Sequence, residues 1–83
     1  MITIYGKPSC GYCNQAKQLV KSMKMEYEYK DISLNQYRTE LLERAPHAKT
    51  VPQIWWGNRY IGGYDKLVRE IEDTAGGYGE SGF

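Results

Sequence analysis

The spacing of apolar residues changes twice in the first part of the chain. Residues 2–5 are β-branched or aromatic and are followed by Gly6 and Pro8, which predicts a short strand. From residue 11 to about residue 24, apolar side chains recur at helical spacing with lysines on the polar side, which predicts an amphipathic helix. In residues 27–32, aromatic and charged side chains alternate, so we expect a second strand there.

A second helix is predicted directly after this strand. Ser33 followed by Gln36 matches the capping box, in which side chains at the start of a helix bond its free main-chain amides. Leu34 and Leu41 lie on one apolar stripe of this helix, which should run to about Arg44.

The remaining residues predict a hairpin and a third helix. Residues 53–56 and 59–61 are rich in aromatic and apolar side chains, and the glycine–asparagine pair between them is a typical hairpin turn. Asp65 can cap the helix that follows, and two glycines at 76–77 should end it.

The order of these elements predicts an α/β fold with a single mixed sheet. The first two strands are joined by a helix, so they should be parallel with a right-handed crossover, whereas the hairpin must add an antiparallel pair. The expected result is a four-stranded sheet in the order β-α-β-α-β-β-α, flanked by three helices. We expect one domain over residues 1–75 and a glycine-rich, flexible tail over residues 76–83.

The cysteine count and the charge limit the possible function classes. The chain of 83 residues has two cysteines, Cys10 and Cys13, which can neither close a long loop nor supply the four ligands of a structural zinc site. We therefore expect no metal site. The net charge of +1 gives no reason to expect nucleic acid or an anionic membrane as partner. Apolar runs are too short for a membrane span or a signal peptide, so we expect a cytoplasmic protein, in which cysteine pairs are usually catalytic.

The segment Cys10-Gly11-Tyr12-Cys13 lies between the first strand and the first helix. Main-chain N–H groups at a helix start lack intrahelical partners, and the helix dipole places partial positive charge there. The pKa of Cys10 should therefore fall below its free value of about 8.5, with Lys7 adding positive charge, and the Cys10 thiolate is the predicted nucleophile. Cys13, within the first turn, should keep its proton and act as the resolving thiol. Two inert buried cysteines, or half of a metal site, are the alternatives.

Three segments together resemble the signatures of the glutaredoxin family. They are Lys7 with Cys10-Gly11-Tyr12-Cys13, then Thr50-Val51-Pro52-Gln53-Ile54, and finally Gly62-Gly63-Tyr64-Asp65. The segments stand in the family's order and at about its spacing, and the likeness extends to about residue 75. The resemblance implies a thioredoxin-like fold, glutathione as co-substrate and no tightly bound organic cofactor.

The resemblance also implies that the segment around Pro52 binds glutathione. Thr50, Val51 and Pro52 match the family's proline loop, in which the residue before the proline offers its backbone to the cysteine moiety of glutathione. Here that residue is Val51, and a cis Val51–Pro52 bond would turn its polar backbone groups toward Cys10. A trans proline that simply starts a strand is the alternative.

The family binds the γ-glutamyl end of glutathione at the start of its last helix, which corresponds to Gly63, Tyr64 and Asp65. Free N–H groups there can hold the carboxylate, and the Asp65 carboxylate can meet the ammonium group, although Asp65 could also only cap the helix. Lys66 replaces an acidic residue that is common at this position in the family. The resemblance therefore implies a weaker hold on the glutathione ammonium.

The remaining glutathione contacts implied by the resemblance come from Lys7 and Tyr12, which match positions along the bound peptide. The glycine carboxylate needs a cation, which Lys7 supplies. Arg38 on the second helix is a further candidate for that carboxylate, with a solvated arginine as the alternative. Gly11 stands where many dithiol members have proline, and in members without that proline an iron–sulfur cluster shared by two chains is possible.

These features predict a glutathione-dependent thiol–disulfide oxidoreductase. Cys10 attacks a protein disulfide or a protein–glutathione mixed disulfide, and a second glutathione or Cys13 releases the bound group. Ribonucleotide reductase could be among its protein partners, and we expect a monomer. Two alternatives stay open: an iron–sulfur carrier that holds a cluster through Cys10, and a redoxin of the same fold that draws electrons from thioredoxin reductase.

Overall fold

The computed structural model describes residues 1–74, and in this part of the chain strands and helices follow one another in the predicted order. The elements are β1 Ile2–Gly6, α1 Gly11–Ser22, β2 Tyr27–Asp31, α2 Asn35–Arg44, β3 Gln53–Trp56, β4 Arg59–Gly62 and α3 Tyr64–Thr74. None of the helices in this part is both long enough and apolar enough to cross a membrane. The predicted tail at 76–83 lies outside the described residues.

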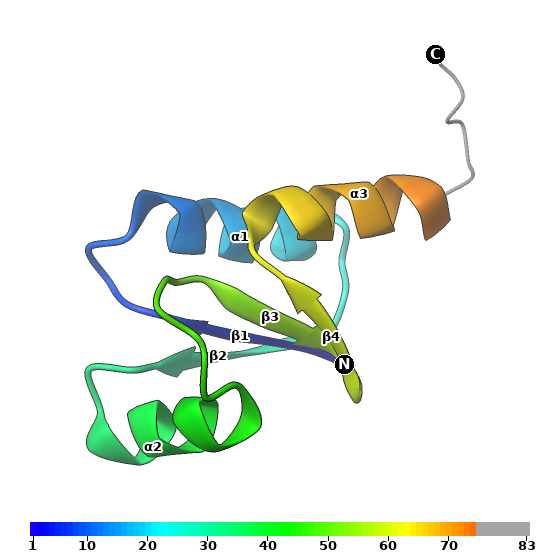
Figure 1. Cartoon of the computed structure of the whole chain (residues 1–83). Helices are drawn as coiled ribbons and strands as arrows, with labels where there is room; N and C mark the ends of the chain where they lie inside the picture. The colour runs from blue at the N-terminus through cyan, green and yellow to red at the C-terminus, as the bar shows by residue number, and fades with distance from the viewer. Residues whose placement is uncertain (75–83) are drawn as a thin grey trace.

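The four strands form one mixed sheet in the order β2-β1-β3-β4. β1 is parallel to β2 and antiparallel to β3, and β3 is antiparallel to β4, which confirms the predicted topology. Helices α1 and α3 lie on one face of the sheet and α2 lies on the other (Figure 1). Strand β1 is therefore central, and its carboxyl end leads directly to the start of α1.

The larger hydrophobic core fills the space between the sheet and helices α1 and α3. It consists of Ile2, Ile4, Ala16, Val20, Ile54, Ile61, Leu67 and Ile71. Alternate residues of β1 point to opposite faces, so Ile2 and Ile4 enter this core while Tyr5 packs with Leu41 and Trp55 under α2. Each fully buried aliphatic side chain contributes roughly 1.5–3 kcal/mol to folding, so this core anchors both helices.

Helix α2 begins differently from the sequence prediction. The predicted capping box at Ser33 and Gln36 is wrong, because Leu34 occupies the N-cap position and no side chain caps the helix there. The Asp31 carboxylate accepts a hydrogen bond from the Ser33 amide at 2.8 Å, which turns the chain at the end of β2. The helix therefore starts at Asn35, and Leu34 is exposed instead of lying on an inward stripe.

The ends of the other two helices also differ from the prediction. Helix α1 ends at Ser22 rather than at about residue 24, and Lys24 adopts a left-handed conformation with a φ of 57°, which no helix continues. Helix α3 begins at Tyr64, so Asp65 lies inside its first turn and is not the cap. At that position its carboxylate still faces the positive end of the helix dipole.

Candidate active site

Cys10 is the N-cap residue of α1. Its backbone is extended, with φ −93° and ψ 117°, and its Sγ atom accepts a hydrogen bond from the Cys13 amide at 3.1 Å. The side chain is partly exposed. The predicted placement of Cys10 at a helix start is therefore confirmed, and an anion at this position is stabilised by the free amide and by the helix dipole.

Cys13 lies one turn further in and is completely buried. Burial, followed by its hydrogen bond with Cys10, raises the pKa of the Cys13 thiol to about 12. Both cysteines are present as free thiols. The two sulfurs therefore have contrasting environments although only two residues separate them in the sequence.

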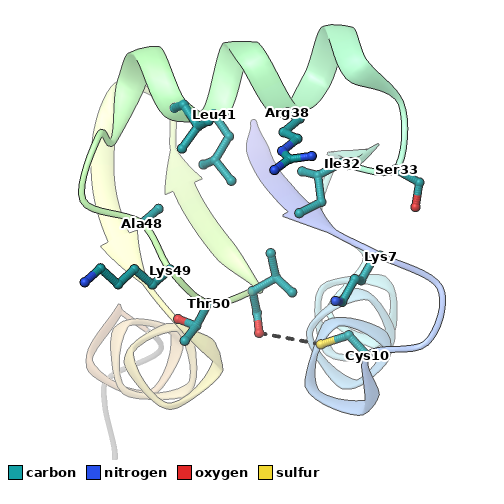
Figure 2. A pocket seen from close by; sticks show the side chains of 11 residues that line it. Lys7, Cys10, Ile32, Ser33, Arg38, Leu41, Ala48, Lys49 and Thr50 are labelled. Atoms are coloured by element: carbon teal, nitrogen blue, oxygen red, sulfur yellow. Dashed lines mark hydrogen bonds between the residues drawn. The ribbon is translucent and has the colours of Figure 1, made fainter.

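The loop before β3 faces Cys10 from the other side of the site. The Val51–Pro52 peptide bond is cis, as predicted, and the Cys10 thiol lies 3.5 Å from the Val51 carbonyl oxygen, to which it donates (Figure 2). The polar backbone of Val51 is thus turned toward the sulfur. A bound peptide with extended backbone could pair with Val51 as it would with the edge of a strand.

The conformation of this loop is held by Gln53, to which the sequence analysis gave no role of its own. Its side-chain amide is buried and donates to the Thr50 carbonyl oxygen at 2.9 Å and to the Thr50 hydroxyl at 3.4 Å. Its oxygen accepts a hydrogen bond of 2.5 Å from the Tyr60 hydroxyl on β4. Gln53 therefore links the hairpin to the segment that presents Val51.

A groove of about 760 Å³ runs from Cys10 toward α2 (Figure 2). It is lined by Lys7, Cys10, Ile32, Ser33, Arg38, Leu41, Leu42, Ala48, Lys49, Thr50 and Val51. All charged groups in this lining are basic: Lys7, Arg38 and Lys49. Arg38 extends from α2 into the groove (Figure 2), so the groove suits a ligand that carries a carboxylate. Lys49 was missed by the sequence analysis, and its position directly before Thr50 is the signal that could have found it.

A smaller cavity of about 360 Å³ lies on the other side of the proline loop. It is lined by Tyr12, Thr50, Val51, Pro52, Gly63, Tyr64, Asp65 and Lys66. The rings of Tyr12 and Tyr64 stack with centroids 5.9 Å apart, which joins the first turn of α1 to the start of α3. Because Thr50 and Val51 line both cavities, the two form one continuous surface past Cys10. All the residues proposed from the sequence for ligand contact lie on this surface.

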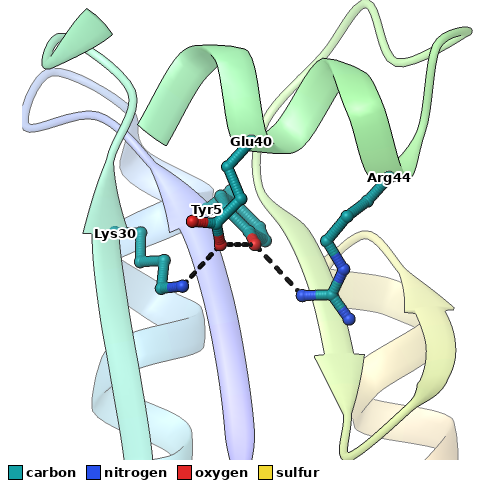
Figure 3. A network of polar contacts seen from close by, with 4 residues as sticks. All are labelled: Tyr5, Lys30, Glu40 and Arg44. Carbon is teal, nitrogen blue, oxygen red and sulfur yellow. Dashed lines mark hydrogen bonds and ion pairs between the residues drawn. The ribbon is translucent and has the colours of Figure 1, made fainter. Parts of the chain in front are cut away.

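The α2 wall of the larger groove is fixed to the sheet by a polar network (Figure 3). Glu40 accepts hydrogen bonds from the Tyr5 hydroxyl and from Lys30, whose Nζ atom is 2.5 Å away. Arg44 donates to the Tyr5 hydroxyl at 3.0 Å, and its guanidinium carbon lies 4.2 Å from the ring centroid of Trp55. These bonds from the middle and the carboxyl end of α2 hold the helix from which Arg38 reaches the groove.

Comparison with known proteins finds one matching family model and several proteins of similar sequence. A family model described as glutaredoxin matches residues 2–61. The chain is 35% identical to glutaredoxin 3 of Escherichia coli (strain K12) over 66 residues, which are 80% of either chain. It is 31% identical over 65 residues to mitochondrial glutaredoxin-2 of Mus musculus and 39% identical over 69 residues to the hybrid peroxiredoxin hyPrx5 of Haemophilus influenzae. It spans only 42% and 28% of those two proteins.

Two solved structures are similar in fold. The reduced glutaredoxin of Escherichia coli superposes with a TM-score of 0.77 at 26% identity, over 92% of this chain and 98% of that one. A buckwheat glutaredoxin–glutathione complex superposes with a TM-score of 0.73 at 25% identity, over 88% of this chain and 69% of that one. The mixed sheet with its flanking helices is therefore the thioredoxin-like fold that the sequence predicted.

Proposed function

The chain belongs to the glutaredoxin family of thiol–disulfide oxidoreductases, and we propose that it uses glutathione to reduce protein disulfides and protein–glutathione mixed disulfides. The observation that carries this proposal is the position of the Cys10 sulfur. It lies at the start of α1, 3.5 Å from the Val51 carbonyl oxygen, between a basic groove and a cavity beside the first turn of α3. A tripeptide with a carboxylate at both ends has complementary surfaces on either side of the sulfur.

In the first step, the Cys10 thiolate attacks the glutathione sulfur of a mixed disulfide. A bond forms between this sulfur and Cys10 Sγ, the bond to the target sulfur breaks, and the target leaves as a thiolate that takes a proton from water. Cys10 then carries glutathione. The open position of Cys10 at the helix start supports this role, because an incoming disulfide can approach it.

Glutathione would lie along the surface that the two cavities share. Its cysteine moiety would pair with the Val51 backbone, and its glycine carboxylate would meet Lys7 and Arg38 in the basic groove. Its γ-glutamyl end would lie in the smaller cavity, where the main-chain amides of Gly63 and Tyr64 and the Asp65 carboxylate meet its two charges.

Two routes complete the cycle. A second glutathione can attack the glutathione sulfur on Cys10, which forms glutathione disulfide and frees the Cys10 thiolate. For a protein disulfide, Cys13 can instead attack the Cys10 sulfur and release the target, and two glutathiones then reopen the internal disulfide. We propose protein disulfides, among them that of ribonucleotide reductase, as substrates, with the monomer acting in the cytoplasm.

The decisive experiment compares two sources of electrons for one purified protein. Reduction of a glutathionylated peptide should be rapid with glutathione, glutathione reductase and NADPH, and absent with thioredoxin reductase and NADPH. The opposite result would identify a redoxin fed by thioredoxin reductase. A brown dimer from anaerobic purification that loses its colour when glutathione is removed would instead support an iron–sulfur carrier.

Two variants test the assigned cysteine roles in the same assay. Cys10→Ser should lose all exchange, because no other thiol is exposed at the groove. Cys13→Ser should keep deglutathionylation, since that route uses Cys10 alone. If Cys13→Ser were as inactive as Cys10→Ser, the assignment of nucleophile and resolving thiol would be wrong.

A further inference from the structure

The Cys13 thiol and the Tyr29 hydroxyl both lie beside Gly6, at the end of β1. A methyl group built on Gly6 would lie 2.8 Å from Cys13 Sγ and 2.7 Å from the Tyr29 hydroxyl. Both atoms therefore lie within 3 Å of one point beside the Gly6 backbone, the sulfur on α1 and the hydroxyl on β2. Tyr29 reaches this place because β2 pairs in parallel with β1, where Tyr29 is opposite Ile4.

The Tyr29 hydroxyl is held by a weak hydrogen bond. It donates to the Lys7 carbonyl oxygen at 3.3 Å, which is long for an O–H···O bond and therefore weak. The Lys17 ammonium lies over the Tyr29 ring, 4.5 Å from its centroid, and Asp31 lies on the same strand. Burial, followed by the negative charge of a Cys13 thiolate, raises the pKa of Tyr29 to about 12, so the phenol keeps its proton near neutral pH.

We propose that Tyr29 is a positioning residue for the resolving thiol, whose hydroxyl donates a hydrogen bond to the Cys13 sulfur as that sulfur becomes a thiolate. The inference rests on the roles proposed above for Cys10 and Cys13, but it does not require glutathione as co-substrate. A buried thiolate has lost its hydration and needs a donor nearby. The Lys7 amide and the Tyr29 hydroxyl are the two hydrogen-bonding groups that act against burial and lower the pKa of Cys13.

The step that Tyr29 assists is the closure of the internal disulfide. Cys13 gives its proton to water, its sulfur forms a bond to the Cys10 sulfur of a mixed disulfide, and the bond from Cys10 to the outer sulfur breaks. The outer group leaves as a thiolate. The two protein thiols are oxidised to one disulfide, and the incoming disulfide is reduced to two thiols.

The test uses a symmetrical aromatic disulfide whose thiolate absorbs visible light, added to the fully reduced protein. The first phase reports attack by Cys10 and the second phase reports attack by Cys13, and each releases one coloured thiolate. In Tyr29→Phe the first phase should be unchanged and the second phase should slow about three- to tenfold. Loss of a hydrogen bond to a charged sulfur lowers the thiolate fraction roughly ten- to a hundredfold, and the higher nucleophilicity of a more basic thiolate offsets about half of this on a logarithmic scale.

Tyr27→Phe is the matched control, because Tyr27 lies two residues earlier on β2, points to the same face of the sheet and packs against the same core. It should leave both phases unchanged. An unaltered second phase in Tyr29→Phe would overturn the proposal, and so would equal slowing in the two tyrosine variants.

A second measurement separates an effect on Cys13 from an effect on the fold. Deglutathionylation by Cys13→Ser does not involve the resolving thiol, so adding Tyr29→Phe to that variant should change neither kcat nor KM. Slowing in this background would mean that Tyr29 acts by holding the loop at Lys7 or by stabilising the fold, and not by assisting Cys13. Because the aromatic disulfide assay contains no glutathione, its outcome is independent of whether the wild-type protein uses glutathione.

Discussion

The two faces of the sheet are packed by different kinds of contact, although the same strands supply both. Under α1 and α3 the core is aliphatic, and residues such as Ile4 and Leu67 are completely buried. Under α2 the buried cluster is small, made of Tyr5, Leu41 and Trp55, and the polar network of Figure 3 adds directional bonds to it.

This difference separates the part of the site that holds the sulfur from the part that forms the outer wall of the groove. Cys10 is the N-cap of α1 and Asp65 lies in the first turn of α3, so both are anchored by the aliphatic core. Arg38 extends from α2, whose place depends on charged groups at the surface. We infer that pH and ionic strength alter the α2 wall more than they alter the surroundings of Cys10.

The largest effect is expected from a truncation in the aliphatic core. Leu67→Ala removes a fully buried side chain that packs between α3 and the sheet, and it should lower the free energy of unfolding by about 2–5 kcal/mol. Leu41→Ala makes the same change under α2, where the smaller cluster can adjust more easily, so its cost should be lower. Urea unfolding of both variants measures the two values, and equal losses would remove the contrast between the faces.

Gly6→Ala is expected to have the next largest effect, on the same face. The added methyl group would lie under 3.0 Å from Cys13 Sγ, from Cys13 Cβ and from the Tyr29 hydroxyl. Cys13 on α1, Tyr29 on β2 or the Gly6 backbone must therefore move. Overpacking of this kind costs roughly 1–3 kcal/mol. The variant should also disturb disulfide closure by Cys13 more than the first attack by Cys10. A variant with wild-type stability and an unaltered second phase in the aromatic disulfide assay would contradict the packing around Cys13.

Features that repeat along the chain, or that involve neighbours in sequence, could be predicted without the structure. The apolar run at residues 2–5 predicts the position of β1. The order of strand, cysteine and helix in the sequence predicts that Cys10 lies at a helix start. The residues around Val51 and Pro52 came from a resemblance to a family, and their cis bond was expected on that ground.

Contacts between distant residues carry no periodic signal and could not be predicted. The bond from Tyr5 to Glu40 joins residues 35 positions apart, and the start of α2 depends on an Asp31 carboxylate that competes with the apparent cap at Ser33. Nothing in the sequence distinguishes Tyr29 from the other seven tyrosines, because only the pairing of β2 with β1 brings it to Cys13.

A smaller effect is expected from removing one charge in the polar network. Glu40→Gln keeps an acceptor for the Tyr5 hydroxyl but loses the ion pair with Lys30, and it should cost about 1 kcal/mol because the Glu40 side chain remains partly exposed to solvent. Glu43→Gln, an exposed change of the same type on the same helix, is the control and should have little effect. The two unfolding free energies should differ at neutral pH, and identical values would show that the network contributes nothing measurable.

The smallest expected effect is a change in stability at acid pH, and it tests the contacts under α2 most directly. The hydrogen bond from Lys30, and then that from Tyr5, lower the pKa of Glu40 below its ordinary value of 4.5. As pH falls below 4.5, the unfolded chain takes up a proton at Glu40 before the folded chain does, so stability from this pair is present above that pH and is lost as pH falls through the folded pKa. The stability difference between wild type and Glu40→Gln should therefore stay constant from about pH 7 to about pH 5 and shrink toward about pH 3. A difference that stays constant across the whole range would place the stabilising contact of α2 elsewhere, and the contrast between the two faces would then rest on their apolar clusters alone.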